Sequence, residues 1–521
     1  MTQQTTSSDA ARQQDVFAFL GDPATHAGAD VARIDTHGAA VFLTKDRVLK
    51  IKRAVRFPFL DYSTLARRKT ACEQELEVNR RFAPQIYRRV VPITRTTNGA
   101  LRIGGDGEPI EWTVEMARFD ELLTLDHLAR QGPLTPGLVA ALAEVIAQSH
   151  RVAPSAATEP WLKSIEPIIA DNTAAFTAGG FAATDVAMLD RASREALSRH
   201  RRLLADRGAR GLVRWCHGDL HLANIVLIDG KPVLFDAIEF DPVFASVDVA
   251  YDLAFPLMDL LHYGRGEAAA GLLSSYLAAT GDDSIDALAA LPLLQSMRAA
   301  IRAKVLLMRP AKDETERQDN RHTAERYFAL ALRLIAPPPP RLIAVGGLSG
   351  TGKSVLARAL AAAVQPLPGA VVLRSDVARK QMFRVAESER LGADAYMPEV
   401  TARVYDGLAA RAASILAQGH SVIVDAVFAR ADERTAIEAI AAKTGVPFQG
   451  LYLTADMATR IARVQGRVAD ASDATVDIVR QQHAYQQDAI DWHKIDASGT
   501  PQQTLELALI AVKLSDQACS T

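Results

Sequence analysis

The sequence predicts two domains: an α+β domain with two lobes, followed by an α/β domain built on a parallel sheet. Three observations predict this layout. The chain has 521 residues, more than one hydrophobic core usually organises. Four consecutive prolines, Pro337 to Pro340, end a long helical stretch. After them, apolar strands alternate with alanine-rich helices, which is typical of a parallel sheet. The expected segments are an extension with a first helix at 1–34, a first domain at 35–335, a linker at 336–340 and a second domain at 341–521.

Composition sets the class of protein but not its partner. Hydrophobic residues make up 49% and charged residues 23%, which are ordinary values for a globular enzyme. A net charge of −2 provides no bulk attraction to nucleic acid or to an anionic membrane. The three cysteines are far apart and lack a C-x-x-C spacing, so reduced thiols are expected. Since we find neither a signal peptide nor a long apolar span, we expect a cytoplasmic protein without a membrane partner.

The first domain divides into a strand-rich part and a helical part. Residues 37–118 contain short strands separated by turn signals, and residues 134–335 are mainly helical. One strand-rich island at 212–241 interrupts the helices. This layout predicts the two lobes.

The island contains a spaced set of polar residues. His217-Gly218-Asp219 is followed by Asn224, and Asp236 comes after an apolar strand. This spacing allows one catalytic base and two metal ligands to surround a phosphate chain. Asp219 is the expected base, and Asn224 and Asp236 are the expected Mg²⁺ ligands, because hard cations prefer oxygen. The alternative is a hydrogen-bonded turn without chemistry, since Asp, Asn and Gly are common turn residues.

The spacing resembles that of the aminoglycoside phosphotransferase and choline kinase family over residues 35–330. The resemblance implies a protein-kinase-like bilobal fold that binds ATP, with a lysine on the α- and β-phosphates and a glutamate partner. The family's spacing favours Lys50 and Glu75 for this pair, with Lys52 and Glu73 as close rivals. It also implies a mostly structural role for Asp252. The glycine-rich phosphate loop is reduced here to the turn around Gly38.

The strongest motif in the chain opens the second domain. The run from Gly347 to Ser354 matches G-x-x-x-x-G-K-[ST] between an apolar strand and a helix, where backbone N–H groups cradle phosphates. Lys353 is expected to reach the β- and γ-phosphates, and Ser354 to bind Mg²⁺. The expected nucleotide-binding residues are Gly347, Gly350, Thr351, Gly352, Lys353 and Ser354.

Other polar residues follow the predicted strands 370–374 and 421–425, which with 342–346 and 448–453 form the expected P-loop NTPase sheet. Asp425 ends one strand in the manner of a Walker B aspartate and is an expected Mg²⁺ ligand. Asp376 follows the other strand and is either an acceptor-activating base or a helix N-cap. The side chains of Arg460, Arg463 and Arg467 share one helix face, which forms either a lid over the phosphate or a solvated surface.

This second set resembles the zeta-toxin and polynucleotide-kinase group of P-loop kinases over residues 341–515. The resemblance implies that Asp376 activates a substrate hydroxyl and that Arg463 or Arg467 belongs to the lid.

We therefore expect an ATP- and Mg²⁺-dependent kinase that phosphorylates a hydroxyl group of an unidentified small molecule, with one or both domains active. One alternative is a regulatory protein that only binds ATP through one degenerate kinase domain. Another is a kinase of nucleic-acid 5′ ends in the second domain. The near-neutral chain, and the lack of aromatic residues among basic ones near 370–400, argue against it.

Overall fold

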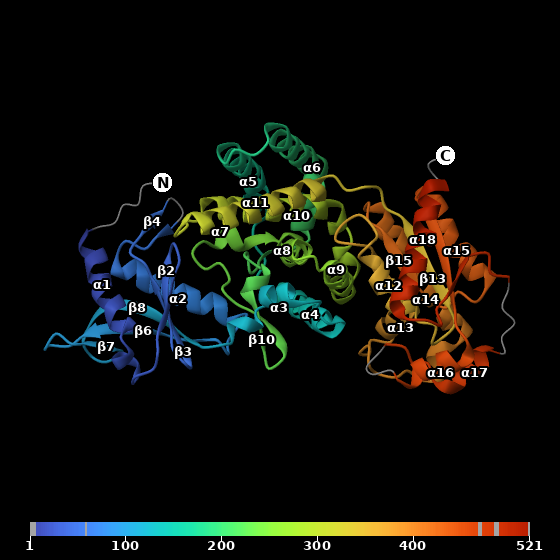
Figure 1. The fold of residues 1–521 in the computed structure, drawn as a ribbon, viewed down its shortest axis with the longest axis horizontal. Helices are drawn as coiled ribbons and strands as arrows, with labels where there is room; N and C mark the ends of the chain where they lie inside the picture. The colour runs from blue at the N-terminus through green and yellow to red at the C-terminus, as the bar shows by residue number, and fades with distance from the viewer. Residues whose placement is uncertain (1–6, 58–59, 467–470, 484–488, 519–521) are drawn as a thin grey trace. The chain divides into compact units, whose positions relative to one another are not determined.

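The computed structural model describes residues 7–57, 60–466, 471–483 and 489–518 (Figure 1). It groups into two compact units, each assembled from several stretches of chain. The first comprises Met1–Gly132, Gln148–Ser164 and Ala205–Phe255, and the second Pro133–Ala147, Ile165–Leu204 and Pro256–Thr521. Because the four prolines lie inside the second unit, this division does not test the domain boundaries expected around the linker at 336–340. These boundaries stay a prediction.

The first unit contains a six-stranded antiparallel sheet in the order β1-β2-β3-β8-β6-β7. Alternation along β3 sends Leu49 and Ile51 into a core with helix α1, and Val48 into a second core with α2. Lys50 and Lys52 share the parity of Val48, so this alternation puts both lysines on the α2 face. The elements are α1 (Ser7–Gly21), β1 (Ala32–Asp35), β2 (Ala39–Leu43), β3 (Arg47–Lys52), α2 (Leu65–Arg80), β6 (Tyr87–Arg95), β7 (Leu101–Ile103) and β8 (Glu108–Ala117).

The strand-rich island forms two small antiparallel pairs in the first unit. Strand β9 (Val213–Trp215) pairs with β12 (Ser246–Asp248), and β10 (Ile225–Ile228) pairs with β11 (Lys231–Leu234). The β10–β11 hairpin turns at Asp229 and Gly230, whose φ angles of 51° and 73° suit a tight two-residue turn. Asp219 and Asp236 lie in loops next to these strands, and Asn224 ends a short 3-10 helix directly before β10.

Helices make up most of the chain from Leu125 to Ile335, before and after the strands of the island. They are α3 (Leu125–Gln131), α4 (Pro136–Val152), α5 (Thr158–Ala178), α6 (Ala183–Ala209), α7 (Pro242–Ala245), α8 (Val249–His262), α9 (Gly266–Thr280), α10 (Ala287–Met308) and α11 (Glu314–Ile335). Among all helices of the described residues, none combines the length and apolar character that a bilayer crossing needs.

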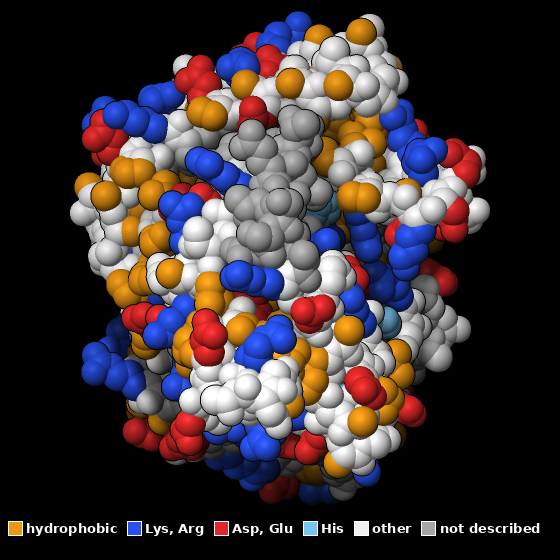
Figure 2. Space-filling view, turned by 90° about the vertical axis from the view of Figure 1, so that its left-hand side faces the viewer, with side chains coloured by type: hydrophobic (Ala, Val, Ile, Leu, Met, Phe, Trp, Pro, Cys, Tyr) orange, Lys and Arg blue, Asp and Glu red, His pale blue; other side chains and the backbone are white. Residues whose placement is uncertain are grey.

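Charged side chains of both signs are interspersed on the molecular face drawn in Figure 2. This mixture agrees with the net charge of −2.

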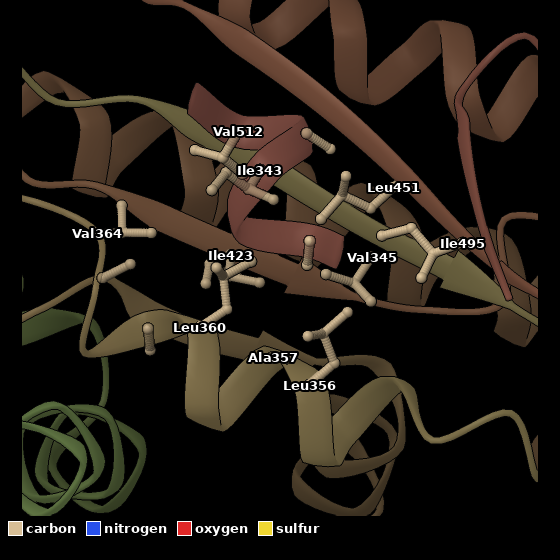
Figure 3. Packing of buried hydrophobic residues seen from close by; sticks show 14 of the residues in the cluster. Ile343, Val345, Leu356, Ala357, Leu360, Val364, Ile423, Leu451, Ile495 and Val512 are labelled. Carbon is tan, nitrogen blue, oxygen red and sulfur yellow. The ribbon is translucent and has the colours of Figure 1, made fainter. Parts of the chain in front are cut away.

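The second unit contains the predicted parallel sheet, in the order β14-β15-β13-β16-β17. Ile343 and Val345 of β13 pack against Leu356 and Leu360 of helix α12 (Figure 3). The sequence predicted four of its strands, and the structure adds the edge strand β17. The strands are β13 (Leu342–Gly347), β14 (Val371–Arg374), β15 (Val422–Asp425), β16 (Phe448–Thr454) and β17 (His493–Asp496).

All five strands run in the same direction, so their carboxyl ends meet at one edge of the sheet. Gly347, Arg374 and Asp425 end the three neighbouring strands there, where ligands of open α/β sheets bind. The helices between the strands are α12 (Lys353–Ala361), α13 (Ser375–Met382), α14 (Pro398–Ala417), α15 (Ala431–Thr444), α16 (Met457–Gln465) and α17 (Val476–His483), and α18 (Pro501–Ala518) follows β17.

Candidate functional site

The first site is centred on two lysines of β3 and one glutamate of α2. Lys50 Nζ lies 2.8 Å from Glu75 Oε1, and Lys52 Nζ lies 2.7 Å from Glu75 Oε2. Glu75 is fully buried, whereas the rival Glu73 is exposed and pairs with Lys69. Burial opposes the charge of Glu75, but the two lysines outweigh it and lower the pKa of Glu75 below its ordinary value. The geometry thus brings Glu75, rather than Glu73, to both lysines.

Contacts beyond Glu75 distinguish the two lysines. Lys50 Nζ lies 2.7 Å from Asp236 Oδ1, whereas Lys52 pairs with Glu239. Burial alone would lower the pKa of Lys50, yet Asp236 and Glu75 raise it well above its usual value. Lys50 therefore stays protonated beside the expected metal ligand. Sequence reasoning missed the pairing of Lys52 with Glu239, because no pattern links residues so far apart.

The expected base Asp219 lies in the loop after β9. Asn224 Nδ2 donates to the backbone oxygen of Asp219 at 2.9 Å and to its Oδ2 at 3.3 Å. His221 Nε2 lies 3.4 Å from the same Oδ2. The Asp219 side chain is 42% exposed, so an acceptor molecule can reach it.

Asp236 lies just beyond β11 in a left-handed conformation, with φ of 60°. Its N–H donates to the hydroxyl oxygen of Tyr87, and the next N–H, of Ala237, donates to Asn79 Oδ1 at 2.8 Å. These anchors hold the turn, which is the kind of strained backbone that clusters at functional sites. The Asp236 side chain is 46% exposed beside Lys50.

Asp252 is fully buried and holds the loop that carries Asp219. Its Oδ1 accepts from the N–H of Gly218 at 2.9 Å, and its Oδ2 from the N–H of His217 at 3.3 Å. His150 Nε2 lies 3.2 Å from Oδ2. Burial lowers the pKa of His217, despite Asp252, so this imidazole is neutral at pH 7. These contacts agree with the structural role expected for Asp252.

The second site is built on the loop between β13 and α12. Gly347, Gly350 and Gly352 have φ angles of 137°, 84° and 95°, which favour glycine. A Cβ at Gly350 would lie 2.6 Å from the backbone oxygen of Arg460. Lys353 Nζ donates to the backbone oxygen of Leu348 at 3.2 Å, and Thr351 Oγ1 donates to the same oxygen at 2.8 Å. The loop is thus folded around its own lysine at the start of α12.

The two expected metal ligands of this site touch each other. Ser354 Oγ donates to Asp425 Oδ2 at 2.6 Å. Arg374, which sequence reasoning did not single out, donates through Nη2 to Ser354 Oγ at 3.2 Å.

Asp376 lies in the first turn of α13, and the N-cap position belongs to Arg374. Its expected alternative role as an N-cap is therefore not what the structure shows. The pKa of Asp376 is raised, chiefly by burial and then by the negative charge of Asp425. Lys353, Arg374 and a hydrogen bond with Ser472 act in the opposite direction but do not outweigh these effects.

The arginines of α16 differ in their surroundings. Arg460 is buried and donates through Nε to the backbone oxygen of Ser349 at 2.8 Å, so it holds the phosphate loop. Arg463 donates through Nη1 to the backbone oxygen of Thr351 at 3.4 Å and through Nη2 to that of Gly499 at 2.9 Å. Arg467, the other expected lid residue, lies outside the described residues.

Two family models match the chain. The phosphotransferase enzyme family matches residues 31–291, and an AAA domain matches residues 342–491. Uncharacterized proteins of Mycobacterium tuberculosis, strains H37Rv and CDC 1551, are 29% identical over 486 residues, covering 90% of this chain and 93% of each relative.

Solved structures resemble separate parts of the chain. A choline/ethanolamine kinase family protein from Mesorhizobium loti is 13% identical and covers 62% of this chain and 99% of its own, with a TM-score of 0.37. A gluconokinase from Sinorhizobium meliloti is 19% identical and covers 34% of this chain and 97% of its own, with a TM-score of 0.25.

Proposed function

Because the chain belongs to the phosphotransferase enzyme family, we propose that it is an ATP-dependent kinase that transfers the γ-phosphate to a hydroxyl group of a small molecule. Both of its sites have the residues for this reaction. The observation that carries the proposal is the contact of Lys50 with both Glu75 and Asp236, which joins the lysine strand to the expected metal ligand. A regulatory site that only binds ATP has no need for a base such as Asp219.

At the first site, Lys50 binds the α- and β-phosphates and is held in place by Glu75. Asp219 accepts the proton of the acceptor hydroxyl, whose oxygen then forms a bond to the γ-phosphorus. The bond from this phosphorus to the bridging oxygen breaks, and ADP leaves with that oxygen. At the second site, Lys353 and the backbone of the phosphate loop bind the phosphates, and Asp376 takes the role of the base. Arg463 and Arg467 are proposed lid residues.

The donor sets of both sites fit Mg²⁺. The pair Asn224 and Asp236 provides an amide oxygen and a carboxylate, and Ser354 and Asp425 provide a hydroxyl and a carboxylate oxygen 2.6 Å apart. These are the hard oxygen donors that Mg²⁺ prefers. When bound, Mg²⁺ neutralises charge on the phosphates.

A phosphoryl-transfer screen tests the proposal. The full-length chain is incubated with ATP, Mg²⁺ and separate panels of sugars, aminoglycosides, nucleosides and oligonucleotide ends. We expect transfer to one of the small molecules, lost in Asp219→Asn if the first site acts and in Asp376→Asn if the second does. ATP binding without transfer to any panel would favour the regulatory alternative, and transfer only to oligonucleotide ends would favour the end-repair kinase.

A further inference from the structure

Arg374 occupies a position at the second site that the proposed reaction does not yet use. It is the last residue of β14, and it lies directly opposite Asp425 in the register of β14 and β15. Its side chain is only 12% exposed. The sheet therefore directs a guanidinium group to the edge where the phosphate loop begins.

The guanidinium contacts the same two groups that are proposed to bind Mg²⁺. Its Nη2 donates to Ser354 Oγ at 3.2 Å, and its Nε lies 3.4 Å from Asp425 Oδ2. Ser354 Oγ in turn donates to that Asp425 oxygen. One cation, one hydroxyl and one carboxylate thus form a closed triangle.

Two carboxylates, of Asp425 and Asp376, and two cations, Lys353 and Arg374, lie around this triangle. Asp425 and Asp376 are close enough that Asp425 raises the pKa of Asp376, after the larger effect of burial, while Lys353 and Arg374 lower it. A guanidinium is always charged, and its planar fork suits both carboxylate and phosphate oxygens. A divalent cation bound at Ser354 and Asp425 would place a second positive charge next to this guanidinium, and the two like charges would repel each other.

We propose that Arg374 is a positioning residue that holds Ser354 and Asp425 together before nucleotide binds. When Ser354 and Asp425 bind Mg²⁺, the guanidinium of Arg374 moves to a phosphate oxygen. This inference rests on the proposed function of the second site. Arg374 then has two opposite effects on ligands. It competes with Mg²⁺ for Ser354 and Asp425, and it strengthens the binding of the phosphates.

The substitution Arg374→Gln separates the two effects. ATP binding is measured by calorimetry over a series of Mg²⁺ concentrations, in the full-length chain carrying Lys50→Met to weaken the first site. We expect the Mg²⁺ concentration for half-maximal binding to fall about three- to tenfold, because the competing charge is gone. At saturating Mg²⁺ we expect ATP affinity to fall about tenfold, because a charge-assisted hydrogen bond is lost.

Two matched variants serve as controls. Arg333→Gln removes the same charge from an exposed position on α11 and should change neither value. Arg374→Lys keeps the charge and should leave the Mg²⁺ dependence near that of the parent chain, even if Arg374→Gln fails to fold.

The outcomes are distinct. If Arg374→Gln leaves the Mg²⁺ dependence unchanged, or raises the Mg²⁺ requirement as a simple loss of structure does, the inference is wrong while the proposed function stands. If the parent chain shows no Mg²⁺-dependent ATP binding that Lys353→Ala removes, the proposed function of this site fails, and the inference fails with it.

Discussion

Lys50 and Lys52 lie on one face of β3, where the buried carboxylate of Glu75 contacts both. Two residues apart on one strand, they follow the alternating pattern that puts such side chains on the same face. The pattern could not separate them, because the difference lies in Asp236 and Glu239, which the fold brings to the strand from far along the chain. Arg374 was missed for the same reason: its contacts depend on the neighbouring strand.

The substitutions Asp219→Asn and Asp236→Asn are predicted to impair different steps, turnover in the first case and ATP binding in the second. Asp219→Asn should lower turnover at the first site about 10²–10⁴-fold with little change in ATP affinity, because a base acts on the acceptor. Asp236→Asn should instead weaken Mg²⁺-dependent ATP binding, because it removes a charged ligand. Calorimetry and turnover on both variants test this. Equal loss of ATP affinity in both would contradict the assigned roles.

Asp376 provides a prediction about pH. Its pKa is raised, so its carboxylate takes up a proton at a higher pH than an ordinary aspartate does. A base must be deprotonated, so transfer at the second site should decline as pH falls through this raised pKa. Since Arg374 lowers the pKa, Arg374→Gln should move the decline to still higher pH. A decline that begins only within the ordinary aspartate range, or does not move in the variant, would count against Asp376 as the base.

At the scale of elements, the strands with strong apolar runs were predictable, and β17 was not. Its residues His493 to Asp496 are mostly polar, and it pairs at the sheet edge with β16 alone. Helix α16 shows a similar limit. The helical repeat predicts that Arg460 and Arg463 share a face of α16. That Arg460 is buried against the phosphate loop depends on tertiary packing, which the repeat does not reveal.

The phosphate loop itself yields a prediction about glycine. Gly350→Ala should destabilise the loop by about 1–3 kcal/mol, because φ is 84° and the new methyl group meets the backbone oxygen of Arg460. ATP binding at the second site should weaken accordingly. The matched control is Gly407→Ala in α14, where nothing lies within 4 Å of the added carbon.

In that control, a helical glycine becomes alanine, which should stabilise the protein by about 0.5–1 kcal/mol. Thermal unfolding and calorimetry measure both variants. Unchanged ATP binding in Gly350→Ala would show that the close approach to Arg460 is not needed.

At the scale of the whole molecule, the predicted fold class is confirmed: a kinase-like domain precedes a domain with a parallel five-stranded sheet. The order of the two resemblances is confirmed as well. Both followed from motifs in which the spacing of polar residues and the flanking apolar strands agree, such as Gly347 to Ser354 after β13. The acceptor could not be predicted, because scattered side chains line such pockets without a pattern.

The central claim is that the chain carries two separate ATP sites, and calorimetric titration of the full-length protein with ATP and Mg²⁺ tests it most directly. The unmodified chain should bind two equivalents of ATP, and Lys353→Ala and Lys50→Met should each bind one. The remaining equivalent should keep the affinity that it has in the unmodified chain. Loss of all ATP binding in Lys353→Ala alone would contradict the claim of two separate sites.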